Sequence, residues 1–260
     1  MKAKIFINKI KGILGLSLQL AKADFKQRNE GSFLGILWYL LEPLFMLFMF
    51  LMVRNVVGQG IPNYPLYLFL GLIMFNFFRK TTSDSIKVIT DNSGFIKSIK
   101  LNHEAFVVSA LLKSVFSHFF EIIILLFLLV YSGISILNIV FYPLVFFFFC
   151  FFVLGISFFA ATLGVYLKDF ANLWRVFTRL LWLATPIFYA SKLISKLNLP
   201  FDFNSLNPLY YFITIARECI AYNKVSQLSL IIGAVIFSLS FFVLGFIVFE
   251  KFKNKFSEMI

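Results

Sequence analysis

An apolar run from Ile36 to Val53 limits what this chain can fold into more than any other feature of its sequence. As a helix, the run would extend about 27 Å, close to the roughly 30 Å hydrocarbon core of a bilayer. A charged stretch precedes it, so we expect a polar surface helix that turns near Gly31 and enters the membrane past Trp38. An ordinary interfacial anchor before a first span would show the same charged stretch followed by an apolar run.

The composition extends this interpretation to the whole chain. Its 260 residues are 60% hydrophobic and 14% charged, whereas soluble domains are about half apolar and a quarter charged. The sequence therefore predicts an all-α membrane protein, because helices satisfy their own backbone hydrogen bonds in lipid. The net charge of +12 is dispersed among apolar segments, which favours contacts with membrane lipids and argues against nucleic acid as a partner.

Six apolar segments are candidate transmembrane helices, and together they predict a single transmembrane domain over residues 1–260. The segments cover about 36–55, 64–78, 107–131, 139–166, 172–190 and 228–249. Residues 1–35 should form the cytoplasmic amphipathic helix, because basic and apolar positions alternate there. Residues 191–226 are too polar and broken for a full span, so we expect an outer re-entrant helical hairpin. In the fourth segment, small residues such as Gly155 and Gly164 should let helices approach closely.

The distribution of basic residues predicts the orientation. Seventeen Lys and Arg lie in the N-terminal segment, the segment 79–104, the turn at 167–175 and the C-terminal tail, against five on the opposite side. By the positive-inside rule, the chain is expected to be a multi-pass protein of the cytoplasmic (inner) membrane with both termini in the cytoplasm.

Four ionisable side chains fall inside predicted spans, where charge is costly and often functional. They are Glu42, Lys113, His118 and Glu121. Lys113 and Glu121 are eight residues apart and share one helix face with Ser117, and His118 lies beside Glu121. The group could relay protons; the simpler interpretation is that His118 and Glu121 pair with each other or with a neighbouring span, or line a wet cavity.

Two other segments could carry function. The polar segment 79–104 should hold one or two short cytoplasmic helices with an apolar ridge, although a merely solvated loop is the simpler interpretation of its residues alone. In the outer segment, tyrosines could stack on sugar rings and Arg217 could pair with a pyrophosphate. An interfacial helix without a ligand fits that segment equally well.

The spacing of several residues resembles membrane permeases from type-2 ABC exporters of cell-surface polysaccharides. At the start of the chain the matching positions are Asp24, Arg28, Ser32, Leu34, Gly35, Trp38 and Pro43. Lys168-Asp169, Asn207-Pro208 and Arg217 then follow in the expected order. The family usually has an Arg-Tyr pair where this chain has Arg28-Asn29.

The resemblance implies a homodimer that exports a lipid-linked polysaccharide of the O-antigen, capsule or teichoic-acid type, driven by two copies of an ABC ATPase subunit. It also implies that 79–104 carries a coupling helix and that 191–226 forms the external gate. The coupling residues would be Asp91, Phe95, Lys97, Ile99, Lys100 and His103. The substrate would enter at Arg28 and pass Trp38, Tyr39, Tyr210, Tyr211 and Arg217.

No chemistry of its own is expected from this chain. It has no Walker A motif, and its two histidines, His103 and His118, have no His or Cys at metal-ligand spacing. We therefore expect no enzyme activity, no catalytic residues, no metal and no cofactor on this chain.

Three other functions share this layout. An ABC exporter of drugs or small lipids usually has a larger outer segment between the first two spans. An ion-coupled secondary transporter would depend on Lys113, His118 and Glu121. A membrane scaffold would tolerate the loss of all three.

Overall fold

The computed structural model describes residues 2–29, 35–58, 60–98, 101–190 and 203–259, and within these ranges the chain is helical without a strand. The all-α prediction is confirmed for this part of the chain. The α-helices are α1 (Lys2–Asn29), α2 (Trp38–Met52), α3 (Arg54–Val57), α4 (Tyr64–Asp91), α5 (Ser93–Ser98), α6 (Glu104–Tyr131), α7 (Tyr142–Tyr166), α8 (Phe170–Ala184), α10 (Phe203–Leu206), α11 (Pro208–Ala216), α12 (Leu228–Phe252) and α13 (Phe256–Met259). A π-helical turn, Arg217–Ala221, continues α11.

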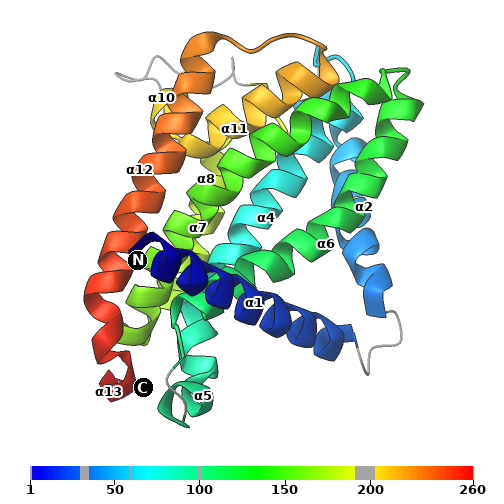
Figure 1. Cartoon of the computed structure of the whole chain (residues 1–260). Helices are drawn as coiled ribbons and strands as arrows, with labels where there is room; N and C mark the ends of the chain where they lie inside the picture. Colours follow the sequence, from blue (N-terminus) through cyan, green and yellow to red (C-terminus); the bar gives the residue numbers. More distant parts are fainter. Residues whose placement is uncertain (1, 30–34, 59, 99–100, 191–202, 260) are drawn as a thin grey trace.

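Helix α4 runs through the middle of the bundle, with α2, α6, α7, α8 and α11 packed around it (Figure 1). From Tyr64 to Phe78 it is apolar on nearly every side and almost wholly buried, as expected of a helix surrounded by others. It then continues to Asp91, into the segment where the sequence pattern predicted separate short helices. No Gly or Pro interrupts residues 79–91, so nothing there ends the helix.

Glycines bring α7 into close contact with two neighbouring helices. A Cβ atom on Gly155 would collide with the backbone of Phe241 on α12, and one on Gly245 would collide with the backbone of Gly155. A Cβ atom on Gly164 would collide with the carbonyl group of Ile86 on α4. The close approach predicted for Gly155 and Gly164 is therefore confirmed.

Three helical segments in the described ranges are long and apolar enough to cross a membrane: Glu104–Tyr131, Ile136–Tyr166 and Leu228–Met259. The apolar α2 has 15 residues, about 22 Å of helix, and α8 also has 15. In α4 the apolar half is followed by a polar one. The chain is thus a membrane-embedded protein, and the count of six spans stays a prediction.

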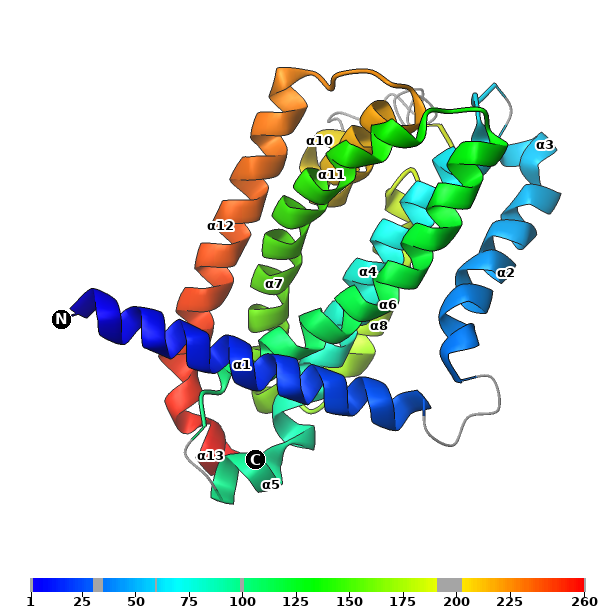
Figure 2. The same ribbon diagram turned by 45° about the vertical axis from the view of Figure 1, so that its right-hand side comes forward.

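The shorter elements gather at the two ends of the bundle (Figures 1 and 2). α5, α13 and the C-terminus lie at one end, called here the α5 end. α3, α10, α11 and the start of α12 lie at the other, the α11 end. Near the α5 end α1 crosses the bundle and packs mainly on α6, as a helix lying on a membrane surface would. The turn predicted near Gly31 lies outside the described residues.

Candidate functional site

A polar cleft lies between α1, α2, α4 and α6. Two cavities of about 250 and 370 Å³ form it and share Ser83 and Asp84 as lining residues. The four ionisable residues predicted inside spans all line this cleft: Glu42, His118 and Glu121 the first cavity, and Lys113 the second. His118 and Glu121, which were expected to pair or to line a cavity, both border the first one, and the presence of water there stays a prediction.

Two polar contacts join α4 and α6 along the cleft. The Lys113 Nζ atom lies 3.0 Å from Asp84 Oδ2, and Lys80 Nζ donates a hydrogen bond to Ser117 Oγ over 3.1 Å. Lys113 therefore pairs with α4, whereas the sequence grouped it with Glu121. Because Asp84 lies one turn beyond Lys80, this pairing requires α4 to stay helical past residue 79. The absence of a helix breaker after residue 79 was the sequence signal that α4 continues through Asp84.

Around His118 three polar side chains form a chain of hydrogen bonds inside the bundle. The Nδ1 atom of His118 lies 2.5 Å from Glu121 Oε2, and its Nε2 atom lies 2.7 Å from the Tyr142 hydroxyl. The imidazole is almost fully buried and stacks on Phe146, with ring centroids 4.5 Å apart. With Nδ1–H donating to the carboxylate, Nε2 can accept from the tyrosine. The pairing of His118 with Glu121 is confirmed; Tyr142, on α7, was missed.

Aromatic stacking connects the cleft to the surface helix. Tyr39 is buried, with ring centroids 5.4 Å from Phe25 on α1 and 5.9 Å from Phe120 on α6. The Lys80 ammonium lies 4.8 Å from the centroid of the Tyr39 ring, at a distance suited to a cation–π contact. Trp38, which precedes Tyr39 in the chain, is half exposed. Arg28 lies in the last turn of α1, and its side chain is outside the described part of the structure.

The predicted coupling segment contains a helix that stands beyond the bundle at the α5 end (Figure 2). On α5, Ile96 is buried in a cluster with Phe256, whereas Phe95 is 57% exposed and Lys97 is exposed. Asp91, the last residue of α4, is exposed as well. An aromatic and a cationic side chain thus face outward from a helix that is anchored on its other side. Ile99 and Lys100 lie outside the described residues.

The start of α6, which follows α5 in the chain, is held by contacts with the C-terminal segment. Lys253 Nζ lies 2.7 Å from Glu104 Oε1 and 2.6 Å from Glu250 Oε1, joining the start of α6 to the end of α12. The imidazole of His103 packs edge-on against Phe256, with centroids 5.9 Å apart. Burial lowers the pKa of His103 below its ordinary value, so the ring is mainly neutral at pH 7. Sequence analysis missed Glu104 and Lys253 as a pair.

At the α11 end, the guanidinium group of Arg217 is buried among backbone carbonyls. Nε donates to the Tyr67 carbonyl over 3.0 Å, and the two Nη atoms donate over 2.7 Å to the carbonyls of Pro186 and Ile187. The guanidinium carbon also lies 3.4 Å from the centroid of the Tyr67 ring. These contacts use three of the five N–H donors of the guanidinium group, and the side chain is buried, so a pyrophosphate could not reach it in this arrangement. The role predicted for Arg217 in the substrate path therefore stays a prediction, one that requires this segment to rearrange.

The remaining residues predicted in the outer segment pack around α11. Asn207 caps this helix, since its side-chain oxygen accepts from the Leu209 N–H over 3.1 Å. Tyr211 packs against Phe237 of α12 and donates from its hydroxyl to the Ser205 carbonyl over 3.0 Å. Tyr210 is partly buried beside it. The predicted re-entrant hairpin is described only in part, because residues 191–202 lie outside the described ranges.

Comparison with known proteins identifies relatives along almost the whole chain. Residues 16–221 match the family described as ABC-2 type transporter. A Myxococcus xanthus protein described as O-antigen export system permease protein RfbA is 23% identical over 248 residues, which cover 95% of this chain and 95% of that protein. A Klebsiella pneumoniae protein of the same description is 26% identical over 254 residues, covering 95% of this chain and 96% of that protein.

Proposed function

This chain belongs to the ABC-2 type transporter family, and from that premise we propose that it is the transmembrane subunit of an exporter of a lipid-linked polysaccharide. The observation that carries the proposal is the match, over 95% of the chain, to permeases named for O-antigen export. Capsule and teichoic-acid chains share the chemistry of a long glycan on a lipid anchor, and they are included in the proposed substrate class.

The energy for export should come from a separate ATPase subunit. We propose two copies of it on a homodimer of this chain, since a two-fold axis lets two identical helical bundles enclose a wider path than one. α5 is the proposed coupling helix. Its exposed Phe95 can insert into a groove on the ATPase subunit, and the charge of Lys97 can fix the position of α5 in that groove. The buried side of α5 transmits a push into α4 and the C-terminal segment.

The proposed topology has six spans, with the α5 end in the cytoplasm. α1 lies at that end and carries all seven N-terminal basic residues, as the positive-inside rule requires. The membrane is then the cytoplasmic, or inner, membrane, and both termini face the cytoplasm. In this orientation the polar cleft opens toward the cytoplasmic leaflet, and the outer segment around Arg217 lies at the opposite surface.

The polar cleft is the proposed place where the lipid-linked substrate first meets the protein. Arg79 and Lys80 line it, and their charges can attract a pyrophosphate arriving beside Arg28 of α1. Trp38 lies beside the same entrance, and its half-exposed ring offers a face for sugars. The neighbouring Tyr39 ring is stacked between Phe25 and Phe120, so it could contact the glycan only if these rings separate. The glycan would then thread outward past the tyrosines of α11.

The direct test is to co-express the chain with its proposed ATPase partner, purify through a tag on one subunit and measure ATP hydrolysis. A stable complex whose activity vanadate inhibits is expected. In the complex, Lys97→Glu combined with Phe95→Ala should reduce the coupling of ATP hydrolysis to export while membrane insertion is unchanged. Arg54→Glu is the matched control, because this exposed residue lies at the other end of the bundle. Unchanged coupling in the α5 variant would show that the coupling helix is assigned wrongly.

A second function, ion-coupled secondary transport, is favoured by one observation, the hydrogen-bonded chain of Glu121, His118 and Tyr142. Such chains can pass protons. Under the exporter proposal, Glu121→Gln and His118→Asn should retain most of the export and its vanadate sensitivity. Export that stops in both variants and continues in the presence of vanadate would instead support ion coupling.

A further inference from the structure

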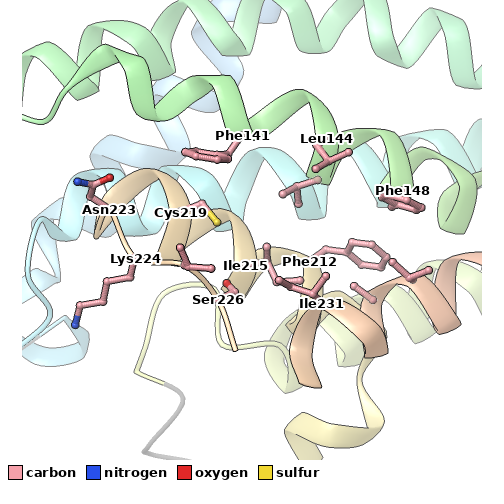
Figure 3. Close-up of a pocket in the computed structure, with 14 residues that line it drawn as sticks. Phe141, Leu144, Phe148, Phe212, Ile215, Cys219, Asn223, Lys224, Ser226 and Ile231 are labelled. Carbon is pink, nitrogen blue, oxygen red and sulfur yellow. The ribbon is translucent and has the colours of Figure 1, made fainter. Parts of the chain in front are cut away.

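An apolar cavity lies at the α11 end, between α7, α11 and α12 (Figure 3). It encloses about 250 Å³, and side chains from the three helices converge on it, among them Phe148, Phe212 and Ile231. An apolar cavity of about 150 Å³ can hold a molecule as large as benzene, so this one has room for several methylene groups. Leu144 and Val225 at its rim are 62% and 91% exposed, so the cavity opens onto the outer surface of the bundle.

The rim of this cavity is polar on one side only. Lys224 is exposed, extends away from the apolar side chains, and is the one charged residue among the described residues that line the cavity. Ser226 is 5% exposed, and its Oγ atom has no hydrogen-bond partner within the described part of the chain. A buried hydroxyl without a partner is unfavourable, and a ligand that brings an acceptor to Ser226 would remove this cost.

We propose that this cavity binds one acyl chain of an anionic phospholipid from the surrounding leaflet. The chain would fill the space beside Phe212, the phosphate would pair with the Lys224 ammonium, and an ester carbonyl would accept a hydrogen bond from Ser226. The apolar cavity, the Ser226 hydroxyl and the Lys224 ammonium follow one another in the same order as the acyl chain, the ester carbonyl and the phosphate of a phospholipid. A zwitterionic lipid such as phosphatidylcholine also carries a phosphate, but its choline cation would repel the Lys224 ammonium and weaken the pairing.

This inference goes beyond the proposed export function, because the ligand is a resident membrane lipid and not the exported glycan. The position of the bound lipid also predicts an effect on the neighbouring π turn. Cys219, in the π turn Arg217–Ala221, lines the same cavity, so a bound acyl chain would hold that turn against α12. The lipid should therefore stabilise the outer segment that contains Arg217.

The test is native mass spectrometry of the purified full-length chain with an equimolar mixture of phosphatidylglycerol and phosphatidylcholine. The wild type should retain phosphatidylglycerol preferentially, and Lys224→Gln should reduce that preference about fivefold. Ala234→Leu should reduce the binding of both lipids, because Ala234 is buried and lines the cavity. The matched controls are Arg54→Gln, an exposed basic residue at the same end, and Ile232→Phe, which points outward from α12; both should behave as wild type.

The proposal would be overturned if Lys224→Gln kept the lipid preference of the wild type and Ala234→Leu retained as much of both lipids as the wild type. So would a dimer that dissociates in Ala234→Leu while lipid binding is unchanged, because that result would assign the cavity to a second copy of the chain. Since lipid retention is measured without ATP or glycan, failure of the export proposal would leave this readout intact.

Discussion

Replacing Arg217 by Met is the perturbation whose effect follows most directly from the structure. The substitution keeps an unbranched apolar stem but removes the three donors that reach the carbonyls of Tyr67, Pro186 and Ile187. The Ile187 carbonyl loses its donor, at about 1–3 kcal/mol, whereas the Pro186 carbonyl keeps the Tyr67 hydroxyl 3.4 Å away and the Tyr67 carbonyl lies within helix α4. The lost cation–π contact, which is desolvated, contributes about 2 kcal/mol more. The free energy regained because the charge is no longer buried offsets part of this loss.

We expect a net loss of about 3 kcal/mol in the free energy that keeps the segment around Arg217 packed in the bundle. At about 1.4 kcal/mol per factor of ten, its open population should rise more than a hundredfold. The assay uses Ala216→Cys, a small change at a fully buried position adjacent to Arg217, in a background without Cys150 and Cys219. The rate of its alkylation by a maleimide measures how often the segment opens.

Two further variants sharpen the test. Arg217→Lys retains the charge without the planar fork, so its alkylation rate should be intermediate. Arg179→Met removes an exposed arginine from α8 and should label like the wild type. If Arg217→Met also labels at the wild-type rate, the carbonyl contacts do not hold the segment, and the reasoning is refuted.

Three other predictions concern the stability of the helical bundle. Gly71→Ala should lower the melting temperature despite the better helix propensity of Ala, because the new Cβ would lie 2.5 Å from Arg217 Nη2; an unchanged melting temperature would contradict the close contact. Gly245→Ala should also lower it, through collision with the α7 backbone, whereas Gly12→Ala on α1 has open space and should not. Lys253→Met should destabilise the α5 end by about 3 kcal/mol, since the buried Glu104 carboxylate loses its cation; equal denaturation midpoints would refute this.

The sequence predicted those helices and contacts whose signal lies within a single segment of the chain. Long apolar runs identified α6, α7 and α12, and small residues identified the tight contact of α7 with its neighbours, because both signals can be read within one segment. The continuation of α4 to Asp91 was missed, although the absence of Gly and Pro after Phe78 indicated it. Polar composition was given more weight there than the lack of a helix breaker.

The partners of the polar side chains could not be predicted in the same way. His118 meets Tyr142 across 24 residues, and Glu104 meets Lys253 across 149, so neither pair leaves a periodic signal. The partners of Arg217 are backbone carbonyls, two of which are available only because the chain leaves the helix after Ala184. Contacts of this kind depend on how helices pack and not on the identity of the acceptor residue.

We propose that ATP-driven force enters this permease through α5, at the cytoplasmic face. A photo-crosslinking amino acid in place of the exposed Phe95 tests it most directly. In membranes that contain the complex, the account predicts a crosslink to the ATPase subunit and protection of that position from reagents added outside intact cells. Labelling of position 95 by an impermeant reagent from outside, with no crosslink to the ATPase, would contradict it.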